Sequence, residues 1–306
     1  MRVGLLWVFW GVISCGGGPK GAYQDLDMTR DPDVHNFSYQ WKNHKGEEHS
    51  VAFGLNAAQV EADMRHPVEL PRDELNGHII QAIRAWSATL PASVTIQAQQ
   101  QGEGVRLNAS GPSADVVKPA LEQGRQVQEA ARREWLQQNY FTTVQSGAIS
   151  FDHARLVAAY APQLRPAAEA LKAGTTTPRE FMRRALPFVQ SIPYEKKTWQ
   201  GPDPGYRRPL ALLERNQGDC DGKTVLFLSL VKAAYPEIDL AVIYVPGHTL
   251  GAVSIAPEAG DQMFEFQGKR FVYVEPVGPG LHPLGQTAPE NRQAARGGEV
   301  RWVPSR

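Results

Sequence analysis

The stretch that decides the fold is Asn216-Gln217-Gly218-Asp219-Cys220-Asp221-Gly222-Lys223, and an almost wholly apolar run, Thr224–Ala234, follows it. Its glycine-containing start predicts a loop, and the apolar run predicts a buried helix that Pro236 stops. Cys220 therefore falls in the first turn of this helix. The positive end of a helix dipole stabilises a thiolate, so we expect a lowered pKa for Cys220 and a reactive sulfur.

Apolar strands are predicted after this helix, at Leu240–Val245, His248–Ile255, Met263–Phe266 and Phe271–Glu275. His248 begins one of these strands, and Glu275 ends another. A thiol nucleophile needs a base such as a histidine, and a carboxylate can hold that histidine in the required orientation and tautomer. We therefore expect a catalytic trio of Cys220, His248 and Glu275.

Each member of this trio also has a structural interpretation. Cys220 could be a buried core thiol, His248 could simply begin a strand, and Glu275 could be a surface carboxylate. Asp219 is predicted to cap the helix and Asp221 to favour its dipole, rather than to take part in chemistry. The Gly-Asp before Cys220 and the Asp-Gly after it favour a turn, and hence an accessible thiol.

Three segments resemble the motifs of bacterial transglutaminase-like proteins: Gly218–Lys223, Pro246-Gly247-His248 and Tyr273-Val274-Glu275-Pro276. The resemblance covers about residues 150–280, and it includes Ile192-Pro193-Tyr194 and Leu212-Leu213 before the cysteine. It implies an α+β fold with a papain-like, transglutaminase-like core, in which the helix carrying the cysteine packs on an antiparallel sheet. It also implies a cysteine acyl-enzyme. The chain departs from the family at Glu275, where many relatives have Asp, and at Thr249, where Ala is common.

Stabilisation of an oxyanion is expected from backbone N–H groups, including that of Cys220, and from one side-chain donor. Gln217, three residues before the nucleophile, is one candidate donor. Tyr194 and Trp199 are the alternatives.

The N-terminus is typical of an exported protein. Arg2 precedes the apolar run Gly4–Ser14, which is shorter than the about 20 residues that span a bilayer. The run ends in Val12-Ile13-Ser14-Cys15-Gly16, which resembles a bacterial lipobox and implies cleavage before Cys15 and lipid attachment to its sulfur. We therefore expect a signal peptide at 1–14, a lipid-anchored linker at 15–35, and a location on the periplasmic or extracellular face of a cell-envelope membrane.

Two alternatives to the lipid anchor remain at this point. One is a plain signal peptide whose cysteine is incidental. The other is a disulfide between Cys15 and Cys220, the two cysteines of the chain. A lipid on Cys15 excludes this disulfide and leaves Cys220 as the free thiol.

The remaining sequence predicts two further regions around the transglutaminase-like domain, which we place at 146–285. A smaller N-terminal α+β domain is expected at 36–145, with a β-hairpin at 36–55 and a long helix at 113–140. Residues 286–306 are polar and rich in Pro and Gly, which predicts an extended tail. Pro187 is expected to kink or end early a helix at Pro178–Gln190.

Composition limits the classes of partner. Lys plus Arg and Asp plus Glu both number 32, and there is no basic block, so nucleic-acid binding is disfavoured. We expect no cofactor and no metal site. The expected partners are a peptide or protein substrate, the membrane through the lipid anchor, and an envelope protein bound by residues 36–145.

The simplest function is an exported thiol enzyme, a cysteine peptidase or amidase that acts through an acyl-enzyme. Water is the abundant acceptor outside the cell, which favours hydrolysis. One alternative is a non-catalytic transglutaminase-like module that binds or assembles envelope components. Another is a true transglutaminase that crosslinks proteins.

Overall fold

A computed structural model describes residues 24–144, 147–195 and 206–303 of the chain. Their fold is α+β, and every named pair of strands is antiparallel. The chain divides into two compact units. Unit 1 combines Met1–Arg65, Val157–Lys196 and Arg207–Arg306, and unit 2 combines His66–Leu156 and Lys197–Tyr206.

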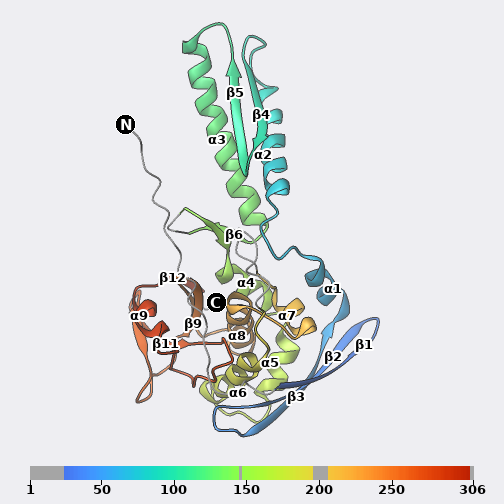
Figure 1. The fold of residues 1–306 in the computed structure, drawn as a ribbon, viewed down its shortest axis with the longest axis vertical. Coiled ribbons are helices and arrows are strands. Elements are labelled where there is room, and N and C mark those ends of the chain that lie inside the picture. The colour runs from blue at the N-terminus through green and yellow to red at the C-terminus, as the bar shows by residue number, and fades with distance from the viewer. Residues whose placement is uncertain (1–23, 145–146, 196–205, 304–306) are drawn as a thin grey trace. The chain divides into compact units, whose positions relative to one another are not determined.

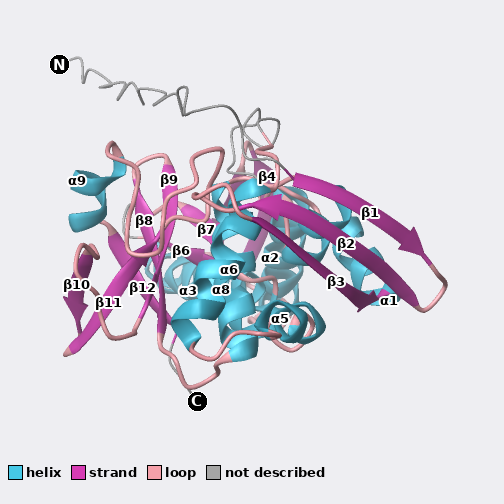
Figure 2. Cartoon of the chain, turned by 90° about the horizontal axis from the view of Figure 1, so that it is seen from below, coloured by secondary structure: helices cyan, strands magenta, loops and turns pink. Residues whose placement is uncertain are grey.

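Unit 1 has three layers, in which helices lie between two antiparallel sheets (Figure 2). The first sheet has the strand order β1-β2-β3. Its strands are β1 (Gln24–Arg30), β2 (Val34–Lys42) and β3 (Glu48–Asn56). The β2–β3 pair confirms the hairpin that the sequence predicts at 36–55.

Alternation along β2 places three aromatic side chains, Phe37, Tyr39 and Trp41, on the buried face of this sheet. Two of them, Tyr39 and Trp41, meet Phe188 on α6 (Pro178–Ser191): the Phe188 ring centroid lies 5.0 Å from that of Tyr39 and 5.3 Å from that of Trp41. The sheet is therefore fixed to the helical layer by apolar contact.

The helical layer is built around α8 (Cys220–Ala234), which is buried along almost all of its length. An all-round apolar helix cannot face water on any side, and α8 contacts α5, α6, α7 and strand β9. The helices around it are α5 (Arg165–Lys172), α6 and α7 (Pro209–Arg215), and α1 (Ala57–Arg65) packs on α7. Helix α4 (His153–Tyr160) crosses the boundary between the two units.

The second sheet has the strand order β10-β11-β9-β8-β12 and packs on α8 through β8 and β9 (Figures 1 and 2). Its strands are β8 (Leu240–Val245), β9 (His248–Val253), β10 (Met263–Phe266), β11 (Lys269–Val274) and β12 (Glu299–Val303). Its other face buries apolar side chains against α9 (Asn291–Arg296). His248 is the first residue of β9, and Glu275 directly follows the last residue of β11.

Unit 2 consists of two helices packed on each other and on a hairpin, with a second, short hairpin beside them. Its elements are α2 (Arg72–Ser87), β4 (Thr95–Gln101), β5 (Gly104–Ser110), α3 (Ala114–Gln138), β6 (Phe141–Thr143) and β7 (Ile149–Phe151).

No helix among the described residues is long and apolar enough to cross a bilayer.

The structure draws the domain boundary elsewhere than at 145/146. The hairpin and α1 that were expected in an N-terminal domain at 36–145 belong to unit 1. The reason is the buried face of β2 and β3, which packs on α5 and α6. The expected signal peptide and the lipidation site Cys15 lie outside the described residues.

Three local expectations are also corrected. The predicted linker contains strand β1, which pairs with β2 along its whole length. The predicted tail contains α9 and β12, and β12 pairs with β8. Helix α6 continues through Pro187 to Ser191, because this stretch is buried and its packing outweighs the one backbone hydrogen bond that a proline removes.

Candidate active site

The start of α8 is held by a side-chain cap and by two closely packed glycines. Asp219 is the N-cap, and its carboxylate accepts a 2.7 Å hydrogen bond from the Gly222 amide. A Cβ atom on Gly218 would lie 2.3 Å from a Leu212 side-chain carbon, and one on Gly222 would lie 2.7 Å from a backbone oxygen. Both positions therefore require glycine for space, and Cys220 sits on a rigid first turn.

The Cys220 sulfur lies between α8 and β9. It accepts hydrogen bonds from the backbone amides of Thr249 and Asp221, and it lies 3.7 Å from Asp221 Oδ1. The Thr249 hydroxyl donates to the same Asp221 oxygen, and the Thr224 hydroxyl donates to the Thr249 carbonyl at 3.1 Å. Because His248 directly precedes Thr249, these contacts bring the histidine's strand to the Cys220 end of α8.

The environment of Cys220 raises the pKa of its thiol well above the usual range. Burial is the main cause, since the residue is 2% exposed, and the negative charges of Asp221 and Asp219 add to it. The two amide hydrogen bonds act in the opposite direction without offsetting these effects. The expectation of a lowered pKa from the helix dipole is therefore wrong, and the resting form is the neutral thiol.

His248 and Glu275 are brought together by adjacent strands. The imidazole Nε2 lies 3.0 Å from Glu275 Oε1, and the carboxylate is buried. Burial would raise the pKa of Glu275, but hydrogen bonds from His248 and the Ala288 amide, with the nearby positive charge of His248, hold the pKa below its usual value. In the neutral imidazole, an ionised Glu275 accepts a hydrogen bond from Nε2–H, and Nδ1 is then the ring nitrogen that can take up a proton.

Two groups that the sequence did not single out also hold Glu275. The Ala288 amide donates to Oε2 at 2.6 Å, and Asn291 Nδ2 donates to Oε1 at 2.6 Å. Both come from the segment expected to be a polar tail. Asn291 begins α9, and its sequence neighbourhood carries no signal of a site.

The two candidate oxyanion donors lie in different surroundings. The Gln217 side chain is exposed. Tyr194 is half-buried, and it forms a parallel bridge with Gly218, two residues before the nucleophile. The backbone of Tyr194 thus lies beside the loop that leads to Cys220, while Gln217 is part of that loop. Trp199 lies outside the described residues.

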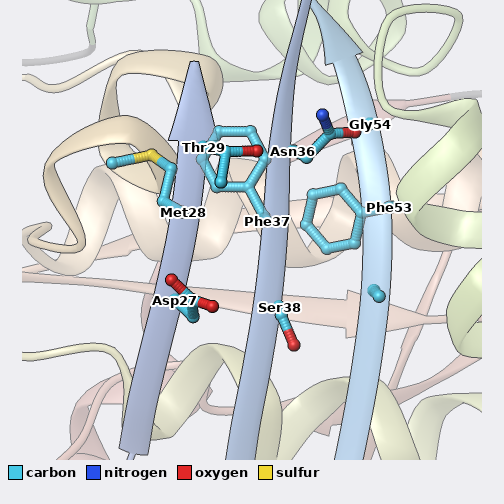
Figure 3. Close-up of a pocket in the computed structure, with 9 residues that line it drawn as sticks. Asp27, Met28, Thr29, Asn36, Phe37, Ser38, Phe53 and Gly54 are labelled. Carbon is cyan, nitrogen blue, oxygen red and sulfur yellow. The ribbon is translucent and has the colours of Figure 1, made fainter. Parts of the chain in front are cut away.

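Two hollows lie away from this trio. Figure 3 shows one of about 380 Å³ on sheet β1-β2-β3, lined by residues that include Asp27, Thr29, Asn36 and Ser38. A second, of about 600 Å³, is lined by Arg30, His35 and Glu214 among others. Neither is lined by Cys220, His248 or Glu275.

Within the part of the chain that the structure describes, no group of three or more His, Cys, Asp or Glu side chains is arranged to hold a metal ion. Comparison of the chain with protein-family models, with curated proteins and with solved structures found no match.

Proposed function

We propose that the protein is an exported, transglutaminase-like thiol enzyme, a cysteine peptidase or amidase that works through a Cys220 acyl-enzyme. The observation that carries the proposal is the bond between His248 Nε2 and Glu275 Oε1, beside a cysteine at a helix start. A buried helix packed on an antiparallel sheet is also the arrangement expected of a papain-like core.

The first half-reaction forms a thioester. The Cys220 sulfur attacks the carbonyl carbon of an amide, and its proton passes to His248 Nδ1. Glu275 stabilises the resulting imidazolium through Nε2. When the tetrahedral intermediate collapses, the C–N bond breaks, the amine leaves with the proton from His248, and the acyl group remains on sulfur.

The second half-reaction regenerates the thiol. Water loses a proton to His248 and attacks the thioester, the C–S bond breaks, and the sulfur takes the proton back as the carboxylic acid leaves. An amine in place of water would give transfer instead of hydrolysis. Water is in excess at an envelope surface, so hydrolysis of a peptide or protein substrate is the proposed outcome.

The raised pKa of Cys220 defines the role of His248 in this scheme. A preformed thiolate is disfavoured at neutral pH, so the imidazole must take the proton as the sulfur attacks. His248 therefore acts as a general base, in the manner of a serine–histidine pair.

The same observation favours a second candidate, a non-catalytic module that binds or assembles envelope components. A neutral thiol that is 2% exposed suits a structural residue as well as a nucleophile. The intact His248–Glu275 bond argues for the enzyme, since a binding module does not require it. The same chemistry with an amine acceptor would make the protein a crosslinking transglutaminase.

The experiment uses p-nitrophenyl acetate as a generic acyl donor. We expect a burst of p-nitrophenolate and an acetyl group located on Cys220 by mass spectrometry, both lost in Cys220→Ala and strongly slowed in His248→Gln. His44→Gln, which changes an exposed histidine on the β2–β3 turn, is the matched control and should acylate like wild type. The same spectra, taken on protein purified from membranes, report whether Cys15 carries the proposed lipid.

Failure to acylate Cys220 in a folded wild-type protein would leave the binding module as the function. Acylation that is insensitive to His248→Gln would remove the histidine from the mechanism. Addition of a primary amine to the acylated protein distinguishes a hydrolase from a transferase. Faster turnover with formation of an amide product indicates a transferase.

A further inference from the structure

A lysine is buried one turn further along α8 than the nucleophile. The Lys223 side chain has no exposed surface, and its Nζ donates a 3.1 Å hydrogen bond to the Gln190 carbonyl, near the end of α6. The first turn of the nucleophile's helix is thus tied to α6 by a charged group.

Gln190 continues this connection to the loop that follows β11. Its Nε2 donates to the Glu275 carbonyl and to the His282 carbonyl, each at 2.8 Å. A Cβ atom on Gly278, within the same loop, would lie 2.1 Å from the Gln190 carbonyl oxygen, so glycine alone lets the loop come this close. Lys223 and Gln190 therefore link α8 to both sides of the loop that begins with Glu275.

Such a lysine is costly to bury. Loss of water lowers the pKa of Lys223 to about 7, although the negative charges of Asp219 and Cys220 favour its charged form. A purely structural tie at this point could be made by a neutral donor or replaced by apolar packing. Lys223 lies between the turn that carries Cys220 and the loop that begins with Glu275. This position suggests that the lysine is retained for the site rather than for stability.

We propose that Lys223 is a positioning residue for the reaction at Cys220: through Gln190 it sets the Glu275 loop, and thereby His248, against the start of α8. This inference rests on the proposed function. Its physical basis is that a general base must lie within hydrogen-bond reach of the group it deprotonates, and that small displacements of such groups are expensive.

The test compares Lys223→Met with Lys232→Met in the full chain. Lys232 lies on the same helix, is 7% exposed, and donates to the Pro236 carbonyl at 3.2 Å, so it matches Lys223 in type, burial and partner. With p-nitrophenyl acetate, Lys223→Met should lower kcat for acylation roughly ten- to a hundredfold with little change in KM. Lys232→Met should stay within about twofold of wild type, while both variants lose stability.

A double-mutant cycle of Lys223→Met with Gln190→Leu, measured by the acylation rate, distinguishes positioning through Gln190 from a general effect on stability. If Lys223 acts through Gln190, the double variant should acylate no more slowly than the worse single variant. Lys223→Gln, which keeps a neutral donor, should recover part of kcat, and it replaces Lys223→Met in the cycle if the latter does not fold.

Three results overturn the inference, and the first two are unchanged kcat in a folded Lys223→Met protein and losses that multiply in the cycle. Equal losses of kcat in Lys223→Met and Lys232→Met would show that helix stability is the cause and also overturn it. A wild-type protein that never acylates Cys220 is a different outcome, because it refutes the proposed function and the positioning role together.

Discussion

The Glu275 carboxylate accepts hydrogen bonds both from His248 and from the C-terminal segment. Oε1 accepts from His248 and Asn291, and Oε2 accepts from the Ala288 amide. These bonds more than offset the cost of burial, so the fold stabilises the ionised form and the pKa of Glu275 is lowered. A carboxylate so fixed can hold the imidazole in one orientation and one tautomer.

Glu275→Gln tests this at nearly constant size. The amide can present an N–H to Nε2 and favour the wrong tautomer, so acylation of Cys220 should fall roughly 10²- to 10⁴-fold. In the folded protein the pKa of Glu275 lies below its ordinary value of 4.5. The ionised carboxylate therefore contributes its full stabilisation above pH 4.5, and this stabilisation is lost as the pH falls through the lowered pKa of Glu275.

Urea unfolding of both proteins at several pH values provides the measurement. The stability advantage of wild type over Glu275→Gln should be constant near neutral pH and shrink below pH 4.5. An advantage that persists unchanged into strong acid would mean that the carboxylate is not the stabilised form.

At this scale the sequence singles out Cys220, His248 and Glu275, and the structure places His248 against Glu275. The sequence does not indicate the surroundings of these residues. His248 follows a glycine, Glu275 precedes a proline, and Cys220 lies shortly before an apolar run, all of which are local signals. Asn291 and Lys223 act through contacts with residues far along the chain, and no local pattern marks them. The pKa of Cys220 was missed for the same reason: it is set by burial, which a sequence does not state.

Among the elements, the beginning of α8 combines a cap and a charge in one residue. The Asp219 carboxylate caps the helix through Gly222, and its charge contributes to the raised pKa of Cys220. Stability and thiol reactivity are therefore opposed at this position.

Two substitutions separate these effects. Asp219→Asn keeps a capping oxygen and removes the charge, so alkylation of Cys220 by iodoacetamide at pH 8 should become faster with stability near that of wild type. Asp219→Ala removes both, and should add a loss of about 1 kcal/mol in the free energy of unfolding. Alkylation rates against pH, with urea unfolding, check the pair; an Asp219→Asn protein that alkylates no faster than wild type contradicts the charge effect.

Elements with a strong internal pattern were predicted well. The β2–β3 hairpin, α8 and strands β8 to β11 are each defined by their own alternation or apolar run. Strands β1 and β12 were missed because their sequences are polar and their stability comes from a partner, β2 in one case and β8 in the other. Helix α7 was missed because it follows a Pro- and Gly-rich stretch and has only seven residues.

In the molecule as a whole, the chain is divided into two units that are not consecutive in sequence. Unit 1 takes up residues on both sides of unit 2 in the sequence, so a linear boundary cannot describe it. The contacts that enforce this are long-range. Tyr39 donates to the Leu213 carbonyl at 3.1 Å, and the buried Glu214 carboxylate pairs with His35 at 3.0 Å and Arg30 at 2.6 Å.

A protein that begins at residue 146, the boundary expected from the sequence, should consequently fail to fold. It would lack the buried face of β2 and β3, where each fully buried side chain such as Phe37 or Trp41 contributes about 1.5–3 kcal/mol. A few such side chains already match the about 5–15 kcal/mol that holds a typical domain together. The matched control begins at residue 24 and keeps every described residue.

Urea unfolding followed by tryptophan fluorescence, together with gel filtration, distinguishes the two proteins. The one that begins at residue 24 should be monodisperse and unfold cooperatively. The one that begins at residue 146 should aggregate or show no transition, because Phe188 and the rest of the helical layer face water. A cooperative transition at the same midpoint in both would show that sheet β1-β2-β3 is dispensable, and that the chain from residue 146 onward is a self-sufficient domain.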